Sequence, residues 1–124
     1  MVRVLIADDR RDTLMTLSIL LRSEGMDVRL VDKGAEVEQA VDEFRPDVVL
    51  LGIEMPDRSG LQVAMDLRSR GLDAPALIAL TGHDGEIARR LTARSGFLHH
   101  VSKPYDPEAL VRLIASVGTK ALAK

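Results

Sequence analysis

The chain has 124 residues, of which 46% are hydrophobic and 29% are charged, and its formal net charge at pH 7 is −2. These values are typical of one globular domain, and the small negative charge does not favour direct binding of nucleic acid. The sequence contains no cysteine, which excludes disulfides and thiolate sites. No apolar run approaches the roughly 20 residues that span a bilayer, so we expect a cytoplasmic protein without a membrane segment.

Five short apolar runs predict β-strands, and segments with helical spacing separate them. The third and fourth runs are almost continuously apolar, as expected for parallel strands that are covered on both faces. The predicted strands are residues 2–7, 27–31, 47–51, 76–80 and 97–101. Apolar residues recur at intervals of three and four, as on one face of a helix, within residues 14–21, 37–44, 61–67 and 110–117.

This regular alternation of strand and helix predicts a single doubly wound α/β domain over residues 2–118, with a short tail at residues 119–124. Four glycines stand where helices should end: Gly25, Gly71, Gly96 and Gly118. We expect four methionines to fill the core: Met15, Met26, Met55 and Met65.

Ligands on such a sheet bind beyond the carboxyl ends of the strands, so the residues there are the candidates for function. The ends of the first, third, fourth and fifth predicted strands carry Asp8-Asp9, Gly52, Thr81-Gly82 and Lys103-Pro104. Adjacent carboxylates are hard oxygen ligands of the kind that Mg²⁺ prefers. A hydroxyl and an ammonium beside such an ion provide what a phosphoryl group needs to hold its oxygens and neutralise its charge.

The ordered set of Asp8-Asp9, Met55-Pro56 with Gly60, Thr81-Gly82 and Lys103-Pro104 resembles a CheY-like response-regulator receiver domain. The phrases FRPDVVLL, ALTG and GFLHHVSKP resemble receivers attached to hybrid sensor kinases. The resemblance implies a flavodoxin-like (βα)5 fold with a parallel sheet in the order 2-1-3-4-5. It places helices 1 and 5 on one face of that sheet and helices 2, 3 and 4 on the other.

The resemblance also implies roles for individual residues. Asp9 would bind Mg²⁺ directly, Asp8 through water, and Glu54 through its backbone carbonyl. Thr81 and Lys103 would contact the phosphoryl oxygens, Tyr105 would change rotamer on activation, and Lys103-Pro104 would be a cis peptide. The phosphoacceptor aspartate of the family falls at position 52, where this sequence has Gly52.

Glycine has no side chain to accept a phosphoryl group or to bind a metal ion. We therefore expect weakened Mg²⁺ binding and a Lys103 ammonium that turns to Asp9 or Asp8, in a partly exposed ion pair of little energetic weight. The function predicted is a non-enzymatic receiver module of a two-component phosphorelay that acts through protein interactions without phosphorylation at the usual site. Its partners would be a sensor histidine kinase or other signalling domains.

Several alternatives remain open at this point. Gly52 is either natural or an engineered replacement of an acceptor, and Glu54, whose side chain is longer, is the candidate substitute acceptor. We expect Asp57 to be a solvated turn acid. A Mg²⁺-dependent phosphohydrolase built on Asp8-Asp9 is a third reading, although the sequence shows no cap domain for it.

Basic residues Arg89 and Arg90 lie on the predicted fourth helix, and Tyr105 and Pro104 follow the fifth strand. In receivers the surface formed by helix 4, strand 5 and helix 5 is a common docking face, so we expect a partner or a second copy of this chain to bind there. His99 and His100 point to opposite faces of a strand and cannot chelate one ion, so we expect packing or capping roles. His83, in the loop after Thr81, is expected to be a surface residue.

Overall fold

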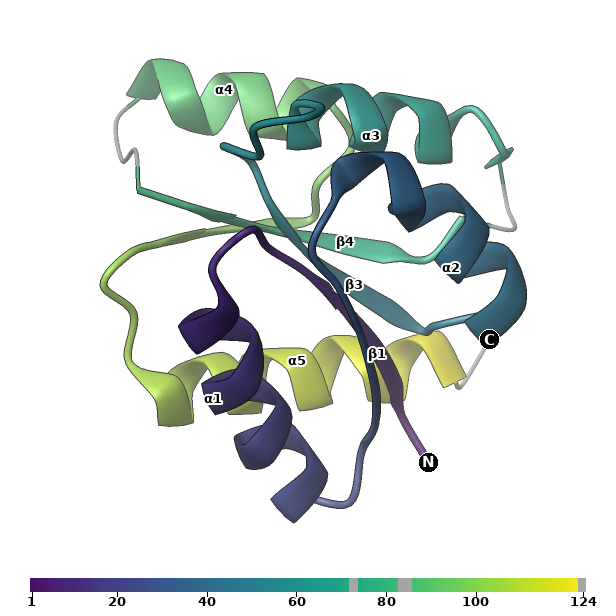
Figure 1. The fold of residues 1–124 in the computed structure, drawn as a ribbon, viewed down its shortest axis with the longest axis vertical. Helices are drawn as coiled ribbons and strands as arrows, with labels where there is room; N and C mark the ends of the chain where they lie inside the picture. The colour runs from purple at the N-terminus through teal and green to yellow at the C-terminus, as the bar shows by residue number, and fades with distance from the viewer. Residues whose placement is uncertain (72–73, 83–85, 123–124) are drawn as a thin grey trace.

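The computed structural model describes residues 1–71, 74–82 and 86–122. Within these residues the chain forms one parallel sheet in the order β2-β1-β3-β4-β5 (Figure 1). This order confirms the predicted doubly wound α/β fold. The strands are β1 (Arg3–Ala7), β2 (Asp27–Val31), β3 (Val48–Gly52), β4 (Ala76–Thr81) and β5 (His99–Ser102).

Helices cover both faces of the sheet, with α1 and α5 on one side and α2, α3 and α4 on the other (Figure 1). A short 3-10 turn, η1 (Gly34–Glu36), leads into α2. The α-helices are α1 (Arg11–Ser23), α2 (Val37–Phe44), α3 (Gly60–Arg68), α4 (Glu86–Arg94) and α5 (Pro107–Leu122).

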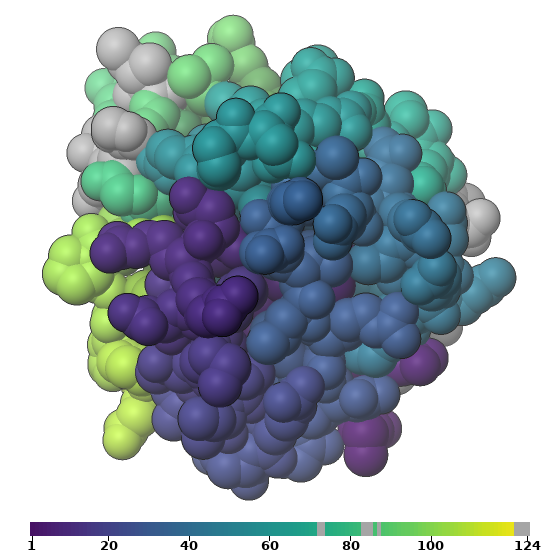
Figure 2. Space-filling view, viewed as in Figure 1, coloured from purple at the N-terminus to yellow at the C-terminus, as the bar shows by residue number. Residues whose placement is uncertain are grey.

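The two-sided core follows from the continuous apolar strands. Successive side chains of a strand point to opposite faces, so Val4 and Ile6 pack toward α1 and α5 while Leu5 and Ala7 pack toward α2 and α3. All four are fully buried. In Figure 2 the N-terminal half of the chain, purple to teal, covers most of the visible face.

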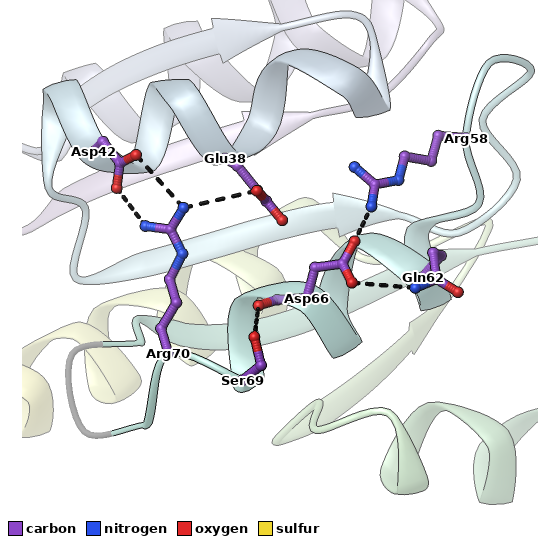
Figure 3. A network of polar contacts seen from close by, with 7 residues as sticks. All are labelled: Glu38, Asp42, Arg58, Gln62, Asp66, Ser69 and Arg70. Carbon is purple, nitrogen blue, oxygen red and sulfur yellow. Dashed lines mark hydrogen bonds and ion pairs between the residues drawn. The ribbon is translucent and has the colours of Figure 1, made fainter.

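Charged side chains join α2 to the end of α3 (Figure 3). Arg70 contacts both Asp42 and Glu38, with its Nη2 3.5 Å from Asp42 Oδ2 and 3.8 Å from Glu38 Oε2. The hydrogen bond from Arg70 lowers the pKa of Asp42 below its ordinary value. Arg58, in the loop before α3, forms an ion pair with Asp66 of α3. The contacts of Arg70 link α2 to the chain after α3, while that of Arg58 lies within the region of α3, and exposed ion pairs of this kind add little to the free energy of unfolding.

Three of the four glycines predicted to end helices adopt the left-handed backbone that favours glycine. The φ angles are 83° at Gly25, 74° at Gly71 and 101° at Gly96. The prediction for Gly118 is wrong, because α5 runs through it to Leu122. A β-carbon at Gly118 would lie 2.4 Å from Cγ1 of Val2. This glycine allows α5 to pack closely, and the expected tail begins as part of that helix.

The methionines divide into two groups. Met26 and Met55 are buried as expected. The prediction is wrong for Met15 and Met65, which are 53% and 54% exposed. They lie on the outer faces of α1 and α3, where neighbouring leucine, valine and alanine side chains already fill the inward positions. Among the described residues, no helix is both long enough and apolar enough to cross a membrane.

Candidate functional site

The carboxyl ends of β1, β3, β4 and β5 bring the predicted site residues together at one end of the sheet. Asp8 follows β1, Gly52 ends β3, Thr81 ends β4 and Lys103 follows β5. Hydrogen bonding continues past the strand ends, because the amide of Lys103 donates to the carbonyl of Thr81 at 2.8 Å. The amide of Ile53 likewise donates to the carbonyl of Leu80, at 3.1 Å. The residues that follow these strands therefore stay adjacent.

Asp8 and Lys103 form an ion pair at the base of the site. The Nζ of Lys103 lies 3.2 Å from Oδ2 of Asp8, and the amide of Arg10 donates to Oδ1 of Asp8 at 2.8 Å. The sequence predicted that Lys103 would turn to Asp9 or Asp8, and the partner is Asp8. The expected exposure is wrong for the carboxylate, since the side chain of Asp8 is 1% exposed and that of Lys103 is 23% exposed.

Gly52 is buried at the end of β3, the position at which the resemblance to receivers predicts a phosphoacceptor. A β-carbon built at this position would lie 3.2 Å from Oδ2 of Asp8 and 3.3 Å from the carbonyl oxygen of Ala7. These distances are shorter than most contacts of a β-carbon, so a side chain fits only if the neighbouring atoms move by a few tenths of an ångström. A carboxylate introduced at residue 52 would face the carboxylate of Asp8, with Lys103 as the nearby cation.

Glu54 and Thr81 are joined by a hydrogen bond between their side chains. The hydroxyl of Thr81 donates to Oε1 of Glu54. Thr81 is 2% exposed, whereas Glu54 lies at the surface. The sequence assigned to Glu54 only a backbone carbonyl role and a role as substitute acceptor. Its carboxylate also accepts a hydrogen bond from Thr81, the residue that was predicted to contact a phosphoryl oxygen.

Asp57 joins two loops that are far apart in the sequence. Its Oδ1 and Oδ2 accept hydrogen bonds from the amides of Gly34 and Ala35, both at 3.0 Å. The hydrogen bonds from Ala35 and then Gly34 lower the pKa of Asp57 below the ordinary value of 3.8. Asp57 is exposed, as expected for a turn acid, and its carboxylate also caps the start of η1, which the sequence did not predict. No local pattern links Asp57 to Gly34.

Tyr105 is half-buried beside the site and packs against the cluster under α1 and α5. Burial, followed by the negative charge of Asp8, raises the pKa of its hydroxyl above the ordinary value of 10.0. The bond between Lys103 and Pro104 is cis, as the resemblance implied.

The sequence of the chain matches the model of a known family. A family model described as the response regulator receiver domain matches residues 4–115. The chain belongs to the response regulator receiver family. The match covers every element from β1 to most of α5, and with it every strand end that forms the site.

Curated relatives of this receiver support the assignment. It is 34% identical over 107 residues to the aerobic respiration control protein ArcA of Escherichia coli K12, covering 86% of this chain and 44% of ArcA. It is 34% identical over 109 residues to the DNA-binding response regulator MtrA of Mycolicibacterium smegmatis, covering 88% of this chain and 47% of MtrA. The chain therefore spans less than half the length of these relatives.

Solved structures share the fold of this receiver. The receiver domain of the Francisella response regulator 1452 superposes with a TM-score of 0.90 at 20% identity, covering 97% of this chain and 98% of that one. A CheY-like receiver protein from Methanospirillum hungatei JF-1 also gives 0.90 at 20% identity, covering 99% and 98%. At 20% identity, this structural similarity establishes the fold and not the function.

Mg²⁺ is the cofactor that the resemblance predicts for this receiver, and the donor atoms test how well it fits. Among the described residues, no three histidine, cysteine or acidic side chains gather closely enough to hold a metal ion. Asp8 already accepts hydrogen bonds on both oxygens, and the carboxylate of Glu54 is turned to Thr81. Asp9 is exposed at the rim. These donors do not fit a tightly bound Mg²⁺.

The α4–β5–α5 side of the receiver carries a hollow of about 300 Å³. Arg89 and Tyr105 line it, while Arg90 pairs with Glu86 along α4 at 2.6 Å. The Oγ of Ser102, which also lines the hollow, is buried and has no hydrogen-bond partner among the residues that the structure describes.

The histidines behave as the strand alternation predicts. His99 is exposed, while the half-buried His100 has its Nδ1 3.0 Å from Oγ1 of Thr92 in α4. The contact attaches α4 to β5, which is a packing role. His83 lies outside the described residues.

Proposed function

We propose that this chain is a receiver module of two-component signalling that acts without accepting a phosphoryl group at residue 52. The observation that carries the proposal is Gly52 itself, which is buried at the end of β3 among Asp8, Thr81 and Lys103. An acyl phosphate requires a carboxylate oxygen as its acceptor, and glycine provides none. The surrounding residues resemble a phosphoryl site that lacks only its point of attachment.

The contacts of the remaining side chains support this proposal. Lys103 neutralises Asp8 at 3.2 Å, so the cation that would otherwise hold a phosphoryl oxygen already has a buried partner. The hydroxyl of Thr81 donates to Glu54. Because a ligand shifts a conformational equilibrium only through its differential affinity for the two states, a chain without an attachment point is not biased by phosphoryl transfer there. Mg²⁺ would bind weakly, through Asp9 and the carbonyl of Glu54.

The α4–β5–α5 side is the surface that we assign to protein partners. Its hollow is lined by Arg89, by Tyr105 and by Ser102, whose buried Oγ has no hydrogen-bond partner within the part of the chain that the structure describes. Arginine and tyrosine are enriched where protein interfaces bind most tightly. A sensor histidine kinase, another signalling domain or a second copy of this chain would dock here.

Sedimentation equilibrium over a concentration series tests this function. We expect any self-association of the native chain to be the same with and without Mg²⁺ and acetyl phosphate. We expect Arg89→Ala to weaken it and Arg11→Ala, on the exposed start of α1, to leave it unchanged. Self-association that changes on adding the phosphodonor would contradict phosphorylation-independent action. Equal effects of the two arginine variants would contradict the assignment of the surface.

A second function is favoured by one observation, namely that the carboxylate of Glu54 reaches the site and contacts Thr81. In this alternative the chain is a Mg²⁺-dependent switch that accepts a phosphoryl group on Glu54, or on an aspartate restored at residue 52. Phosphoryl incorporation into the native chain that disappears in Glu54→Gln would establish it. In-line transfer requires alignment to a fraction of an ångström, which a different backbone position rarely supplies.

A further inference from the structure

The carboxylate of Glu54 reaches the site from the exposed loop after β3, without any modification of the chain. It accepts the hydrogen bond of Thr81, a residue that is 2% exposed at the end of β4. A threonine hydroxyl has one proton to donate, and a bond to an ionised carboxylate is roughly twice as strong as a bond to a neutral acceptor. Glu54 therefore competes for the same proton with any other negative oxygen that enters the site.

A group attached to residue 52 would enter the same space. In the sheet, Gly52 is paired in register with Leu80, the residue before Thr81. A negative group that extends from residue 52 past the strand ends would lie beside the Thr81 hydroxyl. Glu54, two residues further along the chain, reaches this hydroxyl from the loop without any modification.

We propose that the Glu54 carboxylate acts as a built-in substitute for a phosphoryl group, holding the Thr81 hydroxyl and fixing the packing of α4 and β5 in a single state. This inference rests on the proposed function. It goes further by naming the residue that sets the state of the interaction surface. Glu54 is a positioning residue in this account, because it acts through Thr81.

The packing between Thr81 and α4 provides a route for this effect. Thr81 lines an apolar hollow of about 430 Å³, together with Leu91 and Thr92 of α4 and His100 of β5. The contact of 3.0 Å between Thr92 and His100 ties the far side of this hollow to the sheet. His100 also lines the hollow that contains Tyr105. A change in the position of Thr81 would therefore alter the packing of residues that line both hollows, because His100 lines each of them.

Two-dimensional ¹H–¹⁵N spectra of the labelled chain test the proposal. We expect Glu54→Ala and Thr81→Val to shift the amide signals of Leu91, Thr92 and His100 in the same direction. The double variant should shift these signals by less than the sum of the two single variants, because the hydrogen bond between the two side chains is lost in each of them. Glu54→Gln keeps an acceptor oxygen and should lie nearer to the native spectrum. Glu24→Ala, at the exposed end of α1, is the matched control and should leave these signals in place.

Additive shifts in the double variant, or shifts confined to the loop around Glu54, would overturn the proposal. A separate addition of Mg²⁺ and acetyl phosphate to the native chain distinguishes it from the proposed function. New signals on that addition would overturn the proposed function, whereas additive shifts without such new signals would overturn only the role of Glu54.

A second arm asks whether Glu54 resembles a phosphoryl group in its effect. In Gly52→Asp combined with Glu54→Ala, beryllofluoride with Mg²⁺ supplies an acyl phosphate analogue at residue 52. We expect it to return the signals of Leu91, Thr92 and His100 toward their native positions. Movement of those signals further from the native positions would show that Glu54 holds the opposite state, and would overturn the proposal.

Discussion

The ammonium of Lys103 lies 3.2 Å from a carboxylate oxygen of Asp8, and the side chain of Asp8 is almost completely buried. The pair joins residues that are 95 positions apart, and it links the end of β1 to the end of β5 across the sheet. A buried carboxylate without a cation is costly, so this contact stabilises the very edge of the sheet on which the site is built.

Replacement of Lys103 by methionine should destabilise the chain by about 2 kcal/mol, which is less than a fully buried pair would lose because the lysine is partly exposed. Urea unfolding at neutral pH measures this change. Lys120→Met, on the exposed surface of α5, is the control and should have little effect. Equal stability of the two variants would mean that Asp8 does not depend on its lysine.

Tyr105 is the single tyrosine of the chain, so its ionisation can be followed by ultraviolet absorbance. Its pKa should lie above 10.0, since burial and then the charge of Asp8 disfavour the phenolate. Asp8→Asn should lower the pKa of Tyr105 toward 10.0 but not to it, because burial of the hydroxyl still raises the pKa. Because the pKa is raised in the folded state, this contribution to stability is present below 10.0 and is lost as the pH rises through the folded value. A pKa at or below 10.0 in the native chain would contradict the packing described.

Gly60 is required by close packing at the start of α3. A β-carbon there would lie 2.2 Å from the carbonyl oxygen of Gly52 and 2.9 Å from Cα of Ile53. Gly60→Ala should therefore cost about 2 kcal/mol of unfolding free energy, because backbone atoms must move. Gly82→Ala is the matched control, since a β-carbon at Gly82 would meet no heavy atom within 4 Å among the described residues. Thermal unfolding of both variants measures these changes. An equal loss of stability in Gly60→Ala and Gly82→Ala would contradict the requirement for glycine at residue 60.

Asp57 should contribute to stability in a manner that depends on acid pH. Its pKa in the folded chain is lowered by hydrogen bonds from Ala35 and Gly34, so the ionised form is favoured by folding. The contribution is present above the unfolded value of 3.8 and is lost as the pH falls through the lower folded value. Asp57→Asn should remove this part of the acid dependence, as measured by urea midpoints over an acid pH series. Asp32→Asn, on an exposed loop, is the control. An unchanged acid dependence in Asp57→Asn would contradict the capping role.

The fold and the location of the site were predictable because both depend on patterns along the chain. Continuous apolar runs such as residues 47–51 require cover on both faces, and a parallel sheet then brings its carboxyl ends to one edge. That Lys103 pairs with one of the two adjacent aspartates was expected because Gly52 offers it no carboxylate, whereas the choice of Asp8 over Asp9 was left open.

Contacts that depend on loop geometry were not predictable. Asp57 caps residues 23 and 22 positions away, and nothing in the local sequence indicates that pairing. Gly118 reads as a helix end, yet it is a point of close packing against Val2. The hydrogen bond between Thr81 and the Glu54 carboxylate likewise depends on how the loop after β3 lies against β4.

The intact mass after incubation with Mg²⁺ and acetyl phosphate, measured for the native chain beside Gly52→Asp, tests the central claim most directly. The account predicts that the variant gains the mass of one phosphoryl group and that the native chain gains none. A phosphoryl group on the native chain would contradict the claim, because it would reveal another acceptor. A failure of both chains to gain mass would also contradict it, because the site would then lack more than its acceptor.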